Sequence, residues 1–410
     1  MQEDWNPADL VMMSRRSLHD KLAVTNRAAS VGLGLVTSVY ARELCRASNT
    51  EAEIHYLRSG TRKLVTMFGS NNYLGLASHE QVLNCAIKAA RTYGVGLCGS
   101  SFLNGYSSLQ RELEEATAAL KNTEDCIVFP SGYAANLSWA SALLRSSDSV
   151  LCDDDAHMSF REGARANKIR LKRFAHNDLK QAEALAKAKS DGDRYIFVEG
   201  LYSMRGDSCD AHEVHALARD TNSILVVDDA HGTGTMGPTG RGTTELMERG
   251  GDVLIVGTYS KALGANGGFI CSSKPIVNCL RILAPSYMFS AALSPASMAG
   301  ALEAIRILLN EPARVQRLRK NCIEAHSRLK QFNCISDEGS PILFLRCGPD
   351  RSAMEVAKLL EIEGFFVNPI SFPAVSLENS GIRINISSEH TSDELQRLFL
   401  AVEKAWQISA

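Results

Sequence analysis

The hydrophobic pattern of the chain is most regular in its middle part. From about residue 80 onward, short apolar runs alternate with longer stretches of helical periodicity. The short runs are apolar on both faces, which is typical of strands buried within a mostly parallel sheet. The strands that we expect are Cys126–Pro130, Ser149–Cys152, Tyr195–Glu199, Ile224–Asp228, Val253–Gly257 and Gly268–Cys271.

Amphipathic stretches such as Leu109–Leu120, Leu179–Lys189 and Ala211–Asp220 lie between these strands. A strand–helix alternation predicts an α/β fold, in which helices cover both faces of a mostly parallel central sheet.

The pattern changes after about Ser294. The expected elements there are helices at Pro295–Leu309 and Ala313–Phe332, strands at Ile342–Arg346 and Gly381–Ser387, and a final helix from Ser392. We therefore predict three parts. They are an N-terminal helical arm (residues 1–55, with a linker at Asn49–Glu53), a large domain (56–293) and a smaller α+β C-terminal domain (294–410).

Composition narrows the class of protein. Of 410 residues, 45% are apolar and 22% charged, and the formal net charge is −2, so no overall field favours nucleic acid or an anionic membrane. No apolar stretch is long enough to span a membrane, and the polar, acidic N-terminus is unlike a secretory signal. Eleven cysteines without a CxxC pair predict reduced thiols in a cytoplasmic protein, and no metal site.

The segment VLIVGTYSKALGANGG, from Val253, places a lysine just after a buried strand. Ligands of open α/β sheets bind at this carboxyl edge, where Lys261 could be desolvated and nucleophilic. The hydroxyls of Thr258 and Ser260 could donate to a phosphate. Because a lysine after a strand is more often a surface charge, this segment alone does not decide between the two interpretations.

The segment ILVVDDAHGTG, from Ile224, delivers Asp228 to the end of another strand, with His231 three positions later. A carboxylate there needs a cationic partner to stay ionised, and a protonated pyridine nitrogen is such a partner. The alternative is an Asp–Asp pair that makes a turn or binds a metal.

Two further segments follow strands. In FPSGYAAN, the turn Ser131–Gly132–Tyr133 opens a helix, and its backbone N–H groups could bind a phosphate. In CDDDAHMSFREGAR, His157 could stack on a flat ring, although a lone histidine is more often structural.

Together these segments place a phosphate turn, an imidazole, a carboxylate and a lysine in the order that a fold-type I enzyme of pyridoxal 5′-phosphate (PLP) requires. The motifs resemble those of the α-oxoamine synthases, the family of 8-amino-7-oxononanoate synthase, 2-amino-3-ketobutyrate CoA ligase, 5-aminolevulinate synthase and serine palmitoyltransferase. The matching segments span about 320 residues. They are SNNYLGLASH, SGYAAN, EGLYSMRGD, VDDAHGTGTMGPTGRG, GTYSKALGANGG and IRINISSEHT.

The resemblance implies a role for each matching residue. Lys261 is similar to the lysine that carries PLP, Asp228 to the partner of the pyridine nitrogen, and His157 to the stacking ring. His231 and Ser203 are similar to residues that bind the phenolic oxygen of PLP. The residues similar to ligands of its phosphate are Thr258, Ser260, Ser131, Gly132 and Tyr133. Arg383 and Asn71 match residues that bind the amino-acid substrate.

Some positions depart from the family pattern. Gln110 stands where the family has a histidine, and Arg205 stands where it has an aspartate. Ala291, which has Ser290 beside it, replaces a threonine. Residues 374–376 read Ala-Val-Ser in place of Thr-Val-Pro. The stretch AHMSFREGARAN, with SSFLNGY upstream, is more similar to the Vibrio-type autoinducer synthase branch.

The resemblance implies a decarboxylative Claisen condensation of a small α-amino acid with an acyl-CoA, which gives an α-amino ketone, CoA and CO₂. Lys261 would move the Cα proton, and either His157 or His231 would polarise the thioester. A homodimer with active sites at the interface is also implied. The alternatives are another fold-type I reaction (aminotransferase, aldolase or desulfurase) and a non-catalytic partner subunit.

Overall fold

The computed structural model describes residues 17–31, 42–47, 49–56, 60–247, 253–348, 350–372 and 374–409. The chain divides into two compact units. One comprises Asn71–Arg319; the other combines the described residues up to Ser70 with those from Lys320 onward. The domain limits expected from the sequence, after residues 55 and 293, stay predictions.

The first unit is built around a seven-stranded sheet with the strand order β4-β10-β9-β8-β7-β5-β6. The run from β9 to β6 is parallel, and only β10 runs antiparallel to both of its neighbours. The strands are β4 (Asp125–Phe129), β5 (Ser149–Asp153), β6 (Leu171–Phe174), β7 (Arg194–Glu199), β8 (Ile224–Asp228), β9 (Val253–Thr258) and β10 (Gly268–Ser272). The mostly parallel α/β fold expected from the sequence is confirmed.

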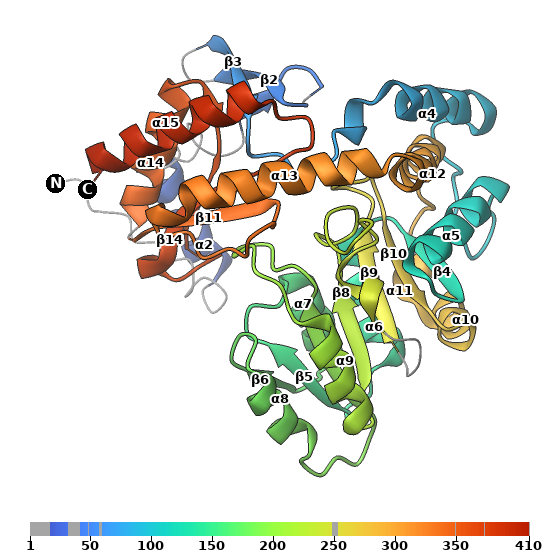
Figure 1. Cartoon of the computed structure of the whole chain (residues 1–410). Coiled ribbons are helices and arrows are strands. Elements are labelled where there is room, and N and C mark those ends of the chain that lie inside the picture. Colours follow the sequence, from blue (N-terminus) through green and yellow to red (C-terminus); the bar gives the residue numbers. More distant parts are fainter. Residues whose placement is uncertain are drawn as a thin grey trace. The chain divides into compact units, whose positions relative to one another are not determined.

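Helices cover both faces of this sheet because its strands are apolar on both sides (Figure 1). One face packs against α6 (Gly132–Leu143), α7 (Met158–Ala166), α10 (Lys274–Leu283) and α11 (Pro285–Met288). The other packs against α8 (Leu179–Ala186) and α9 (Ala211–Asp220). The remaining helices are α4 (Glu80–Tyr93), α5 (Ser108–Lys121), α12 (Pro295–Asn310) and α13 (Pro312–Leu329), the last of which continues into the second unit.

The contact between α6 and α7 is unusually close. A Cβ atom on Gly163 would lie 2.9 Å from the Cβ of Ala140, so only glycine lets the two helices approach this far. Trp139 of α6 stacks on Phe160 of α7, with ring centroids 5.0 Å apart. This packing holds α7 against the second half of α6.

The second unit contains two smaller sheets, with strand orders β1-β2-β3-β12 and β11-β14-β13. The strands are β1 (Glu43–Leu44), β2 (Glu51–Tyr56), β3 (Thr61–Met67), β11 (Ile342–Gly348), β12 (Phe365–Phe366), β13 (Asn368–Ile370) and β14 (Ser380–Asn385). The α-helices that lie entirely within the described part of this unit are α2 (Leu18–Val31), α14 (Asp350–Ile362) and α15 (Ser392–Ser409).

The expected and observed elements differ mainly near the N-terminus. The expected arm is helical at Leu18–Val31, but Glu51–Glu53, which we assigned to a linker, begin β2. The alternation of buried Ala52 and Ile54 with more exposed neighbours is the period of a strand. Much of the rest of the arm falls outside the described residues.

Candidate active site

The sequence-predicted residues of the first unit gather at one edge of its sheet. The parallel strands β7, β8 and β9 end there at Glu199, Asp228 and Thr258. Glu199 pairs in register with Asp228, and Gly268 pairs with both Thr258 and Phe129. The turns after β4, β5, β7, β8 and β9 therefore leave the sheet at the same edge, as the sequence predicted.

Asp228 is buried and well supplied with hydrogen bonds. Its Oδ2 accepts from the side-chain amide of Asn136 at 2.6 Å, and its Oδ1 accepts from the backbone N–H of Ala230 at 3.1 Å. Both donors are neutral groups, so neither forms an ion pair with this carboxylate. The arrangement leaves a buried negative charge ready for a cationic ligand group.

The adjacent Asp229 belongs to a different network. Its Oδ2 accepts from Nζ of Lys121 at 2.6 Å, and its Oδ1 from the hydroxyl of Thr243 at 2.6 Å. The two aspartates therefore do not form a joint ligand set. No cluster of three or more potential metal-ligating side chains occurs among the residues that the structure describes.

His157 caps the N-terminus of α7. Its Nδ1 accepts from the backbone N–H of Ser159 at 3.3 Å and lies 2.8 Å from the hydroxyl of Ser159. Burial lowers the pKa of His157; the charge of Asp228 acts in the opposite direction, and that of Lys261 acts in the same direction as burial. His157, Asp228 and Lys261 are therefore close enough to interact electrostatically.

Glu199 belongs to the same electrostatic group, although we did not single it out from the sequence. Burial, and then the nearby charge of Asp228, raise the pKa of Glu199 well above its usual value, while Lys261 opposes the shift. Its Oε2 accepts from the backbone N–H of Ser203 at 3.3 Å, and its buried Oε1 has no hydrogen-bond partner among the described residues. Glu199 thus lies beside Asp228 at a place where burial disfavours the charged form of its carboxyl group.

His231 lies in the loop after β8, where it is buried and contacts Tyr73. The hydroxyl of Tyr73 lies 2.9 Å from Nδ1 of His231 and 3.1 Å from Oδ1 of Asn71. Asn71 and His231, which the sequence predicted separately, are therefore joined through one tyrosine hydroxyl.

A tight cradle forms where α6 begins. Ser131 caps α6 by accepting from the N–H of Ala134, which leaves the first N–H groups of the helix, those of Gly132 and Tyr133, at its positive end. A Cβ on Gly132 would lie 3.6 Å from Oγ1 of Thr258, so this hydroxyl borders the helix N-terminus. The hydroxyl of Ser260 is 2.8 Å from the same oxygen. Such a cradle suits a phosphate.

Two further predicted residues are buried, and the backbone N–H of one of them, Ser203, donates to Glu199. Ser203 is buried four residues after the end of β7. Arg383 belongs to the second unit, where it is buried on β14 and donates to Oδ1 of Asn385 at 3.1 Å.

Two departures from the family pattern have structural partners. The amide of Gln110 donates to the buried carboxyl of Glu114 at 3.1 Å. Arg205 donates to Asp207 at 2.8 Å, and Asp207 also contacts His176 at 3.0 Å. Although burial opposes a charge there, hydrogen bonds to Asp153 and Asp207 raise the pKa of His176 to about 9.

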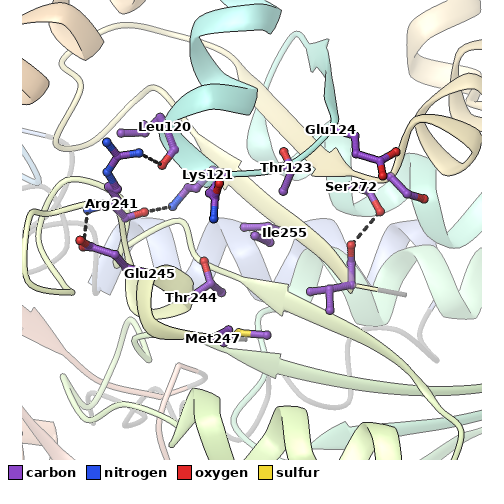
Figure 2. Close-up of a pocket in the computed structure, with 13 residues that line it drawn as sticks. Leu120, Lys121, Thr123, Glu124, Arg241, Thr244, Glu245, Met247, Ile255 and Ser272 are labelled. Carbon is purple, nitrogen blue, oxygen red and sulfur yellow. Dashed lines mark hydrogen bonds between the residues drawn. The ribbon is translucent and has the colours of Figure 1, made fainter. Parts of the chain in front are cut away.

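A cavity of about 630 Å³ lies at the opposite edge of the sheet, where β9 begins and β10 ends. Figure 2 shows Lys121, Arg241 and Glu245 along its wall, with Ser272 bonded to the start of β9. It is separate from the edge that carries Asp228 and Thr258.

The chain resembles known proteins over most of its length. Residues 63–402 match the model of the family Aminotransferase class I and II. A serine palmitoyltransferase of Bacteroides ovatus is 36% identical over 368 residues, which are 89% of this chain and 91% of that protein. A putative 8-amino-7-oxononanoate synthase of Desulforudis audaxviator is 37% identical over 345 residues, 83% of this chain and 89% of that protein.

Solved structures agree with these matches. A structure of SPT with PLP has a TM-score of 0.89 at 29% identity and covers 96% of this chain and 99% of its own. A serine palmitoyltransferase of Sphingomonas wittichii has a TM-score of 0.87 at 28% identity, with coverage of 96% and 99%. Among the described helices of this chain, none is both long and apolar enough to cross a membrane.

Proposed function

We infer the reaction of this chain from the premise that it belongs to the α-oxoamine synthase family, within the class I and II aminotransferases. It is a PLP-dependent acyltransferase, and its reaction is the decarboxylative condensation of an amino acid with an acyl thioester. The roles of individual residues in that reaction are our proposals.

The residues at the carboxyl edge fit PLP on three counts. The N-terminus of α6, with Thr258 beside it, offers donors to a phosphate. Asp228 offers a carboxylate to a protonated ring nitrogen. Lys261 is close enough to this carboxylate that the charges of both groups affect the pKa of His157 and that of Glu199. When bound, PLP supplies an electron-withdrawing ring that stabilises a carbanion at the amino-acid Cα.

Four side chains are assigned to orienting the cofactor. Asp228 would hold the ring nitrogen of PLP in its protonated form, and His157, whose pKa is lowered by burial, would face the ring. His231, which contacts Tyr73, and Ser203 would bind the phenolic oxygen of PLP. The single observation that carries the proposal is that Asp228, His157 and Lys261 form one electrostatic group beside an anion cradle.

Lys261 is the residue that we propose to carry the cofactor and then to move the Cα proton of the substrate. It follows a strand that is buried along most of its length, and an amine at such a place can be desolvated, which favours its neutral, nucleophilic form. We propose that Arg383 binds the carboxylate of the amino acid, because a guanidinium pairs with a carboxylate through two parallel hydrogen bonds. Asn71 is assigned to the substrate on the resemblance alone.

The test is a coupled assay on the purified enzyme with PLP. A panel of small amino acids is screened for release of free thiol from acyl-CoA donors of increasing chain length, together with release of ¹⁴CO₂ from the carboxyl-labelled amino acid. We expect both products in equal amounts, and neither with Lys261→Ala. Transfer of the amino group to a 2-oxo acid, without thiol release, would instead make the chain an aminotransferase.

We also propose that the protein is a cytoplasmic homodimer. Large apolar side chains are exposed on two segments of the first unit, at Val95, Leu103 and Phe289. The segments are adjacent, since the backbone N–H of Ala292 donates to the carbonyl of Gly99 at 2.8 Å. Exposed apolar patches of this kind mark protein interfaces. Light scattering should give twice the chain mass of 44.6 kDa, and Phe289→Asp should shift it toward that of the monomer.

A further inference from the structure

A single buried amide joins two of the proposed catalytic groups. Asn136, in the second turn of α6, donates from Nδ2 to Oδ2 of Asp228 at 2.6 Å and to the hydroxyl of Ser159 at 3.0 Å. Its Oδ1 accepts from the indole N–H of Trp139 at 3.1 Å. All four side chains are buried.

The orientation of this amide is fixed by chemistry. An indole N–H can only donate and a carboxylate can only accept, so the oxygen of Asn136 must face Trp139 and its nitrogen must face Asp228. A flipped amide would set two donors against each other at Trp139 and two acceptors against each other at Asp228. Trp139 cannot yield, because it is stacked on Phe160 at 5.0 Å and lies 6.1 Å from Phe197.

The pattern of donors and acceptors continues to His157. The hydroxyl of Ser159 accepts from Asn136, so its own hydrogen is available for Nδ1 of His157 at 2.8 Å. The backbone N–H of Ser159 is directed at this nitrogen too, at 3.3 Å. Nδ1 must therefore carry a lone pair, and a neutral His157 holds its hydrogen on Nε2. The lowered pKa of His157 agrees with a neutral ring.

We propose that Asn136 is a positioning residue that holds the Asp228 carboxylate directly and, through Ser159, fixes His157 as its Nε2–H tautomer. The chain of donors runs in one direction, from Trp139 through Asn136 and Ser159 to His157. Hydrogen bonds in such a chain polarise one another, so its members act as a unit. The role of Asp228 and His157 in binding PLP rests on the function proposed above. The hydrogen-bond geometry of these two side chains does not depend on that function.

The consequence is a coupling between two contacts of the cofactor. The carboxylate that holds the ring nitrogen and the imidazole that faces the ring are set by one amide on α6. The same helix begins at the phosphate cradle. A hydrogen-bond donor at Nε2 of His157 is thereby available to the substrate at every turnover without a change of tautomer.

The test separates the two arms of Asn136. Protein labelled with ¹⁵N-histidine is studied without cofactor by long-range ¹H–¹⁵N correlation, and His157→Gln assigns the signal. The parent should show the Nε2–H tautomer. Ser159→Ala removes the hydroxyl donor to the imidazole and leaves the longer bond from the backbone N–H, so part of the His157 population should change to the Nδ1–H tautomer while PLP affinity stays within about threefold of the parent.

Asn136→Ala removes both arms. It should mix the tautomer of His157 and also weaken PLP binding by about tenfold or more, because Asp228 loses its side-chain amide donor. The isosteric Asn136→Asp keeps the acceptor for Trp139 but sets a second acid against Asp228, and should weaken PLP binding as well. If the alanine variant does not fold, the measurement of PLP affinity is made on Asn136→Asp instead.

The matched control is Asn167→Ala at the end of α7. Asn167 also bridges the two helices, donating to Ser141 at 2.9 Å and to the carbonyl of Gly163 at 2.8 Å. Its loss should lower stability without changing the tautomer of His157 or the PLP affinity. An Nδ1–H tautomer in the parent, or an Asn136→Ala variant with unchanged tautomer and affinity, would overturn the proposal. Failure of the parent to bind PLP would refute the proposed function instead and leave the tautomer result standing.

Discussion

The buried ion pair between Lys121 and Asp229 gives the sharpest stability prediction. Both side chains are fully buried, and Nζ lies 2.6 Å from Oδ2. Lys121 also donates to the carbonyl of Arg241 at 2.5 Å, while Asp229 accepts two hydrogen bonds from Thr243. The pair ties the end of α5 to the loop that follows β8, directly beside Asp228. We therefore expect its loss to weaken the first unit.

The magnitude depends on the charge that each substitution leaves behind. Lys121→Met strands a buried carboxylate, and a buried pair broken on one side costs about 3–5 kcal/mol. Because Asp229 keeps its two bonds from Thr243, we expect the lower end, about 3 kcal/mol. Asp229→Asn strands the ammonium and should cost a similar amount. The double variant buries no unpaired charge, so it should lose about 3 kcal/mol in all, not about 6.

Urea denaturation of the protein without cofactor, followed by far-UV circular dichroism for all four proteins, measures the coupling. We predict a coupling free energy of about 3 kcal/mol, with single variants that unfold at clearly lower urea than the parent. The control is Arg111→Met, which removes a surface contact of Arg111 with Glu115 at 2.7 Å and should cost less than about 1 kcal/mol. Additive losses in the double variant would refute the reasoning.

Two histidines and one arginine give three more predictions. The pKa of His176 is raised from 6.5 to about 9, so its charge stabilises the fold fully below pH 6.5 and less as the pH rises through 9. The variant His176→Asn should therefore be less stable than the parent by roughly 2 kcal/mol at pH 7, and by little above pH 10. Thermal melts across that pH range measure the difference. Burial lowers the pKa of His390 from 6.5 to about 4, so the parent should lose stability as the pH falls through this interval. Thermal melts of His390→Asn over the same interval should show a shallower loss. Arg383→Lys should raise KM for the amino acid by about tenfold with a smaller change in kcat, since lysine cannot form the paired hydrogen bonds; an unchanged KM would remove Arg383 from the substrate site.

The strands and the edge of the sheet could be predicted because most strands are short runs that are apolar on both faces. Ile224–Asp228 was predicted with its observed limits, and the polar residue that ends it lies at the carboxyl edge. By contrast, β6 (Leu171–Phe174) was missed because Lys172 and Arg173 interrupt its apolar pattern. Burial on an outer strand of the sheet is incomplete, so the sequence signal is weak.

The residues that hold the site together could not be predicted in the same way. Asn136 and Glu199 both lie in motifs that we recognised. No spacing in the sequence shows that Asn136 donates to Asp228, 92 positions away, or that Glu199 pairs in register with Asp228. The one local signal was the amide of Asn136 among the mostly apolar residues of Tyr133–Trp139, which we did not use. Networks of this kind depend on tertiary packing, here on the close approach of α6 and α7 at Gly163.

The central claim is that Lys261 forms the covalent bond to PLP. Borohydride reduction of the purified enzyme with PLP, followed by proteolysis and mass spectrometry, identifies the attachment site without any substrate. We predict one modified peptide, with the cofactor on Lys261. A modification on another lysine, or a protein that binds no PLP, would contradict this claim.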